Sequence, residues 1–212
     1  LKRHLGVSYP TAWLMHHKIN RAMANQEDFH LLSGAVQLDD AYLGGERSGG
    51  TTGRGSENKV PFVAAVSLDA DGHPLHLKLS MVSGFTSQAI SAWAKASLLP
   101  GSVVTSDGLS CFAAVVDAGC MHRPMTIGTR KPRDLPNFLW VNTVLGNLKT
   151  SLAGTFHSFK FRKYAPAYLA AFAYRFNGRF DLRNLAARLI VDVARTPPSP
   201  ANRIRGDAET HC

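Results

Sequence analysis

Cysteine is scarce in this chain of 212 residues, and its distribution shows no structural pattern. The three cysteines, Cys111, Cys120 and Cys212, are odd in number and include no Cys-x-x-Cys pair. The sequence therefore predicts neither a disulfide framework nor a cysteine-based zinc site. Such usage fits a reducing compartment, and we expect a cytoplasmic protein.

Long apolar runs are also absent. No uninterrupted apolar stretch approaches the roughly 18 residues that a membrane span requires. No charged segment followed by an apolar one opens the chain, so we expect no signal peptide. The first residue is Leu1 rather than methionine, which favours a fragment of a longer protein.

Acidic residues are few in comparison with basic ones. The chain has 24 Lys and Arg against 15 Asp and Glu, which gives a formal charge of +9 and an isoelectric point of about 9.8. Such a charge attracts polyanions, and nucleic acid is the leading candidate partner. Solubility alone is the alternative explanation, because many basic proteins bind no specific anion.

The length allows one domain of ordinary size with a small appendage. We predict a partial helix-turn-helix segment over residues 1–30 and one main domain over residues 31–195. From residue 196 the chain is rich in proline and polar residues. Because such a tail buries too little apolar surface to offset the entropy of ordering, we expect residues 196–212 to be disordered.

The first segment has the pattern of two helices joined by a glycine turn. Ser8 can cap the second helix, and Ala12, Met15, Ile19 and Met23 follow at helical spacing. In a helix-turn-helix this second helix enters the DNA major groove, and an ordinary helical hairpin has the same spacing. The candidate DNA-binding residues on its solvent-facing sides and before it are Lys2, Arg3, His16, His17, Lys18 and Arg21.

The main domain alternates between strand and helix patterns, which predicts an α/β fold. The expected order is three strands, a helix, a strand, a short helix and a fifth strand. The strands are expected at residues 35–39, 62–68, 75–81, 103–105 and 121–127, and the helices at residues 87–98 and 109–118. Apolar stripes at helical spacing then predict three helices, around Trp140 to Leu152, Leu169 to Phe176 and Leu182 to Val193. A loop rich in Gly, Ser and Thr over residues 44–59 carries Arg47, Arg54 and Lys59, and it is either a basic hairpin that follows DNA or a simple linker.

Two aspartates follow predicted strands that are separate in the sequence, Asp39 after Val36-Gln37-Leu38 and Asp107 after Val103-Val104-Thr105-Ser106. Open α/β sheets bind ligands beyond the carboxyl ends of such strands. Carboxylates gathered there can hold two Mg²⁺ ions about 3.5–4 Å apart, as in metal-dependent nucleases. Taken singly, each aspartate is more typical of a turn or a helix cap.

An Asn-x-Lys pair follows on a predicted helix. Asn147 and Lys149 flank Leu148, which belongs to the apolar stripe. An asparagine oxygen is a neutral metal ligand, and a lysine ammonium suits a phosphoryl oxygen. Spacing alone favours a solvated helix surface for both.

Several short motifs extend this pattern over residues 1–179. They are Val-Gln-Leu-Asp-Asp-Ala-Tyr-Leu-Gly-Gly from Val36, Gly-Arg-Gly-Ser-Glu-Asn-Lys-Val-Pro from Gly53, Ser-Asp-Gly from Ser106, Gly-Asn-Leu-Lys from Gly146, Gly-Thr-Phe-His from Gly154 and Arg-Phe-Asn-Gly-Arg from Arg175. With these motifs the chain resembles bacterial insertion-sequence transposases of the DDE superfamily. It is most similar to the ISXO-like group, in which asparagine replaces the third acidic residue and lysine follows two positions later.

The resemblance implies a ribonuclease-H-like fold, a mixed sheet with flanking helices. It implies that Asp39, Asp107 and Asn147 bind Mg²⁺ or Mn²⁺, as two ions, and that Lys149 assists at the phosphate. The implied reaction is cleavage of double-stranded DNA at the transposon ends and transfer of the freed 3′-hydroxyl to target DNA, by a homo-oligomer in the bacterial cytoplasm. Further implied DNA contacts are His157, for which a structural role is the alternative, and Arg175 and Arg179.

The sequence departs from the family pattern at several positions. Asp40 stands where glutamate is usual, Ala41 where threonine or serine is usual, and Gly178 where a second arginine is usual. We expect Asp39 to be the ligand and Asp40 to support it. The zinc ribbon usual in the family is absent from this sequence. A nuclease that only cleaves, and a DNA-binding remnant without catalysis, are therefore the alternatives to an active transposase.

Overall fold

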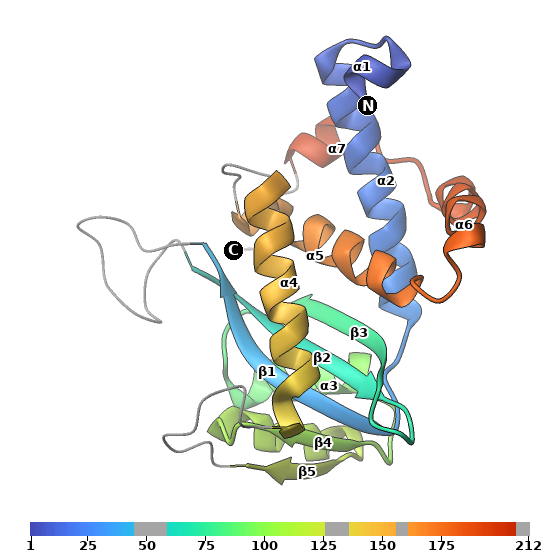
Figure 1. Cartoon of the computed structure of the whole chain (residues 1–212). Helices are drawn as coiled ribbons and strands as arrows, with labels where there is room; N and C mark the ends of the chain where they lie inside the picture. Colours follow the sequence, from blue (N-terminus) through green and yellow to red (C-terminus); the bar gives the residue numbers. More distant parts are fainter. Residues whose placement is uncertain (45–58, 126–135, 156–160, 207–212) are drawn as a thin grey trace. The chain divides into compact units, whose positions relative to one another are not determined.

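The computed structural model describes residues 1–44, 59–125, 136–155 and 161–206 (Figure 1). Its contacts divide the chain into two compact units, one of residues 30–161 and one that combines residues 1–29 with 162–212. The expected single domain of residues 31–195 is thus divided, because the helices after residue 161 pack with the N-terminal helix. Each unit is described by itself below.

The unit of residues 30–161 is built on a five-stranded sheet in the order β3-β2-β1-β4-β5. Its strands are β1 (Ala35–Leu43), β2 (Val60–Leu68), β3 (Pro74–Met81), β4 (Val103–Ser106) and β5 (Met121–Pro124). The first three strands pair antiparallel, whereas β4 lies parallel to both β1 and β5. This mixed α/β sheet confirms the predicted fold class and is consistent with a ribonuclease-H-like fold.

The β2–β3 turn is held by one aspartate side chain. Asp69 Oδ1 accepts hydrogen bonds from the backbone N–H groups of His73 at 2.8 Å and Asp71 at 3.0 Å. The first of these bonds contributes most to lowering the pKa of Asp69, because both stabilise its charged form. Gly72 adopts a φ of 80° in this turn, a conformation that glycine tolerates.

One face of the sheet is covered by α3 (Ser87–Ser97) and η2 (Ser110–Ala118), a 3₁₀ helix where the sequence predicted a short helix (Figure 1). The core on this face joins Leu38 of β1 with Ile90 of α3 and Phe112 of η2, all fully buried. Thr86 caps α3 by accepting a hydrogen bond from the Ala89 N–H at 3.2 Å.

The other face of the sheet is covered by α4 (Leu139–Thr155), which follows the short 3₁₀ helix η4 (Pro136–Phe138). Val141, Val144 and Leu148 on α4 are buried, as their helical spacing predicts. Side chains alternate between the faces of a strand, so Leu38 points to the α3 face while its two neighbours in β1 point to α4.

The unit of residues 1–29 and 162–212 is helical. Its helices are α1 (Lys2–Leu5), α2 (Tyr9–Phe29), α5 (Phe161–Asn177, whose first residue belongs to the other unit), α6 (Leu182–Arg195) and α7 (Ala201–Gly206). Gly6 turns the chain between α1 and α2 with a φ of 63°, and the Thr11 N–H donates to Ser8 Oγ at 3.3 Å. The two helices and the turn are present, and a DNA-binding role for them stays a prediction. No described helix is both long enough and apolar enough to span a membrane.

Two expectations about the C-terminal part need correction. Residues 201–206 form α7, with Ile204 only 9% exposed, so the disorder expected from residue 196 does not hold there. The predicted stripe on α6 is buried only in part. Leu185 and Leu189 are partly buried against the cluster of Met23, Ala171 and Tyr174, whereas Leu182 is 68% exposed. Spacing identifies an apolar stripe, but it does not determine how much of the stripe a neighbouring helix covers.

Replacing Leu38 with alanine should lower the free energy of unfolding by about 2–5 kcal/mol, because the truncated side chain leaves a cavity in the core. Chemical denaturation followed by circular dichroism measures this loss. Leu75→Ala, at a position that is 36% exposed, is the matched control and should cost much less. Equal losses for the two variants would contradict the assignment of Leu38 to the core.

Candidate functional site

The parallel pairing of β1 with β4 brings the predicted aspartates together. Leu38 pairs with Ser106, so Asp39 and Asp107 are the next residues on two adjacent strands. Carboxylate oxygens of Asp39, Asp40 and Asp107 all lie within 4.8 Å of one another, and the three residues are partly exposed. Because like charges at this spacing repel one another, a divalent cation between them would relieve the repulsion, and these residues could hold one.

The sequence predicted that the first strand ends at Asp39, but β1 continues beyond this residue. β1 continues to Leu43 because its antiparallel ladder with β2 continues, and Asp39 pairs there with Ala64. Only the parallel ladder to β4 stops at Leu38. At Asp39, β1 is therefore no longer paired with β4 but is still paired with β2, and this pairing holds the backbone of Asp39 in place.

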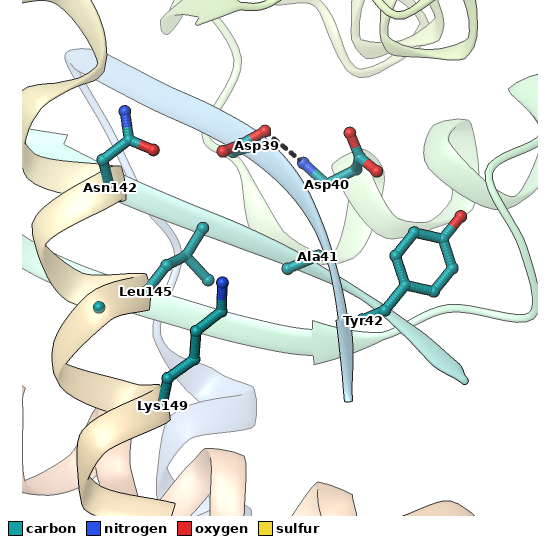
Figure 2. Close-up of a pocket in the computed structure, with 8 residues that line it drawn as sticks. Asp39, Asp40, Ala41, Tyr42, Asn142, Leu145 and Lys149 are labelled. Carbon is teal, nitrogen blue, oxygen red and sulfur yellow. Dashed lines mark hydrogen bonds between the residues drawn. The ribbon is translucent and has the colours of Figure 1, made fainter. Parts of the chain in front are cut away.

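Local hydrogen bonds orient the carboxylates. Asp39 Oδ1 accepts from the Asp40 N–H at 2.9 Å, and Asp107 Oδ1 accepts from the Leu109 N–H at 3.1 Å. The backbone N–H of Asp40 thus points to its neighbour's carboxylate (Figure 2).

Ser106, the buried neighbour of Asp107, fixes the turn after β4. Its Oγ lies 2.9 Å from His122 Nε2 and accepts a hydrogen bond from the Gly108 N–H at 3.4 Å. Burial lowers the pKa of His122, which favours a neutral ring that accepts the Ser106 hydroxyl proton. The turn that carries Asp107 is therefore tied to β5.

Helix α4 completes an open pocket of about 530 Å³ beside the carboxylates. The residues that line the pocket are Asp39, Asp40, Ala41, Tyr42, Asn142, Leu145, Gly146 and Lys149. Figure 2 shows Asn142 and Lys149 projecting from α4 on the side that faces β1. The pocket thus combines carboxylate and amide oxygens with one ammonium group.

Asn142, rather than the predicted Asn147, lines this pocket. Residues seven apart are separated by nearly two full helical turns, so Asn142 and Lys149 share one face of α4. Residues two apart on a helix point in directions about 160° apart, so Asn147, which is exposed, faces away from Lys149. The seven-residue spacing of Asn142 and Lys149 is the sequence signal that would have identified the pair.

A second group of possible metal ligands lies in the β2–β3 turn. Asp69, Asp71 and His73 place ligand atoms within 4.8 Å of one another. Asp69 uses its carboxylate to hold the turn, and Asp71 and His73 are exposed. The turn geometry accounts for this group without a ligand.

The predicted DNA-binding residues have different environments. Lys2, Arg3, Lys18 and Arg175 are exposed, Arg21 and Lys59 are partly exposed, and Arg47, Arg54 and His157 lie outside the described residues. His17 is only 4% exposed, which corrects its expected position on a solvent-facing side. Its ring lies 4.2 Å from Trp13 and 4.9 Å from Tyr164, because this face of α2 packs on α5. His16 is half-buried beside Tyr168.

Arg179 is also used within the protein. Its guanidinium carbon lies 3.9 Å from the ring centre of Phe176 and 4.1 Å from that of Phe180, and Nη1 donates to the Phe176 carbonyl at 2.7 Å. The stacking fixes the plane of the guanidinium. Arg179 is partly exposed, and its DNA contact stays a prediction. Gly178 beside it is buried, and an added Cβ would lie 2.5 Å from Leu185 Cδ1, so the usual arginine would displace that side chain.

Asn142→Ala should weaken Mn²⁺ binding about 10- to 100-fold, because it removes an oxygen donor beside the carboxylates. Isothermal titration calorimetry measures the affinity. Asn147→Ala on the exposed side of α4 is the matched control and should bind Mn²⁺ like the unmodified chain. The reverse pattern would restore the predicted Asn147.

The stability of the helical unit should decrease as the pH is lowered through the range in which His17 titrates. Burial, together with His16 and Lys163, lowers the pKa of His17 from 6.5 to about 4. Below pH 6.5 the unfolded chain binds a proton that the folded chain excludes, so stability is lost as the pH falls from 6.5 to about 4. Thermal unfolding across this range should show a smaller loss for His17→Phe, and an unchanged slope would contradict the assignment.

Comparison with known families gives a match that spans the residues of the site. The model of the ISXO2-like transposase domain matches residues 31–177, which is more than half of the chain and includes Asp39, Asp107, Asn142 and Lys149. A search of curated proteins gave no match. The family match also accords with the mixed sheet and its acidic cluster. The chain belongs to the ISXO2-like transposase domain family.

Proposed function

We propose that this chain is a DDE-type transposase that cleaves double-stranded DNA at insertion-sequence ends and transfers the freed ends to target DNA. The observation that carries the proposal is the cluster of Asp39, Asp40 and Asp107 beside Asn142 and Lys149 in one open pocket. An open pocket suits a substrate as large as a DNA strand, because the reacting phosphate must approach from outside.

The residues of this pocket fit divalent metal ions. Mg²⁺ and Mn²⁺ prefer oxygen ligands, and the cluster offers carboxylate oxygens from two strands with an amide oxygen nearby. Asp39 and Asp107 would hold the ions, with Asn142 as the third member. When bound, two such ions stabilise the attacking and leaving oxygens of an in-line displacement at phosphorus.

Asp40 has a specific part in this proposal. Asn142 is neutral and does not replace the negative charge of a third acidic ligand. Asp40 supplies that charge from the neighbouring position on β1, within 4.8 Å of the other carboxylates. The site then has three carboxylates, the same charge as a site with three acidic ligands.

Lys149 binds the DNA phosphate in this proposal. Its side chain lies on the same face of α4 as Asn142 and borders the pocket. An ammonium is a compact charge that attracts phosphoryl oxygens and stabilises the charge that develops in the transition state. Lys149 thus orients the scissile phosphate toward the carboxylates.

The remaining charge favours binding along the DNA backbone. The formal charge of +9 predicts affinity that falls steeply with salt. The exposed Lys2, Arg3 and Lys18, with Arg21, are candidates for contacts through the helix-turn-helix, and Arg175 for contacts elsewhere. Joining two transposon ends requires two active sites, so we expect a homo-oligomer on DNA.

Incubation with Mg²⁺ or Mn²⁺ and supercoiled DNA that carries the element's ends should give metal-dependent nicking and joining. Asp107→Ala should reduce both to background, and Lys149→Ala should slow them about 100-fold. Asn147→Ala on the same helix is the matched control and should keep full activity. Gel electrophoresis separates nicked and joined products.

The same assay distinguishes the alternatives. Nicking without joining would identify a nuclease that only cleaves. Intact DNA binding without any cleavage would identify a binding remnant. Cleavage that survives Asp107→Ala would contradict the proposed site itself.

A further inference from the structure

Gln37 is a buried polar residue on β1, only 4% exposed. Its Oε1 accepts hydrogen bonds from the backbone N–H groups of Trp140 and Val141, each at 3.0 Å. Both bonds join residues more than 100 positions apart in the sequence. A side chain of the sheet is therefore bonded directly to the first turn of α4.

These two N–H groups need such a partner. Helix α4 begins at Leu139, and the first N–H groups of a helix have no acceptor within the helix itself. Gln37 satisfies two of them from another element, where a residue just before the helix commonly caps it. The Trp140 Nε1–H also donates to the Gly72 carbonyl at 2.7 Å, which ties the same turn to the β2–β3 turn.

The two hydrogen bonds from α4 to Gln37, called the anchor below, lie next to the pocket on both β1 and α4. Gln37 precedes Asp39 by two residues in β1, so both side chains point to the α4 face. Val141 directly precedes Asn142 in α4. Turning α4 by one residue position about its axis would rotate Asn142 by about 100° away from the carboxylates. The anchor thus fixes the element that must present Asn142 and Lys149.

We propose that Gln37 is a positioning residue, which sets the register of α4 on β1 and thereby holds Asn142 opposite Asp39. Gln37 itself does not line the pocket. This inference rests on the proposed function, because it assigns to Gln37 the geometry of that same site.

The first test measures the anchor without metal or DNA. Hydrogen exchange by NMR on the full chain should show protected N–H groups at Trp140 and Val141. Gln37→Met removes the acceptor at similar size and should abolish this protection, whereas Gln37→Glu keeps an acceptor oxygen and should retain it. The side-chain amide signal of Asn142 should shift in Gln37→Met, while that of Asn147 stays unchanged as an internal reference.

The second test asks whether the anchor acts through Asn142. Gln37→Met should weaken Mn²⁺ binding about 10- to 100-fold, as is typical when support for a metal ligand is lost. Gln37→Glu should restore most of this affinity. In an Asn142→Ala background the Gln37→Met change should add little, because the group that it positions is already missing.

The outcomes separate this inference from the proposed function. Lost protection with unchanged Asn142 signal and unchanged Mn²⁺ affinity would overturn the positioning role and leave the proposed function intact. Fully additive effects of the two substitutions would also overturn it. If the unmodified chain bound no Mn²⁺, the proposed function would fail, and the Asn142 signal alone would decide the positioning role.

Discussion

The candidate site depends first on the parallel pairing of β1 with β4. This ladder brings together two aspartates separated by a β-meander and a helix in the sequence, and it ends at the pair that immediately precedes them. Beyond that pair β4 ends, and among the described residues β1 has no strand partner on that side, where the carboxylates are partly exposed. On the other side β1 remains in its antiparallel ladder with β2. The sheet thus exposes the acidic cluster to ligand while holding its backbone in place.

The second requirement is the placement of α4 across the sheet. Packing of its apolar stripe selects the face of the helix that meets the sheet, but such packing tolerates small shifts along the helix axis. Directional hydrogen bonds to the first turn of α4 remove that freedom, since an N–H group must point at its acceptor. Asn142 and Lys149 then face the carboxylates because they are seven residues apart on one helix.

Some basic residues of the helical unit pack against other side chains of the protein, and others are exposed and are candidates for DNA binding. Arg179 stacks on two phenylalanine rings, and His17 is buried among aromatic rings of α2 and α5. Arg179 thus also packs within the helical unit, whereas the buried His17 adds nothing to the net charge of +9, which counts histidine as neutral. The exposed Lys2, Arg3, Lys18 and Arg175 remain candidates for contacts with DNA.

The sequence by itself determined the α/β class, the succession of strands and helices along the chain, and the choice of Asp39 and Asp107 as candidate ligands. Strand periodicity and acidic residues after apolar runs are local signals. The family resemblance was likewise carried by short local motifs, and the family comparison confirmed it. Only the tertiary structure decided which asparagine lines the pocket and that His17 is buried. Both depend on how a helix is turned about its axis and on what covers it, which are set by contacts between residues distant in the sequence. The extent of β1 and the partial cover of α6 were decided in the same way, by pairing and packing partners that no local pattern encodes.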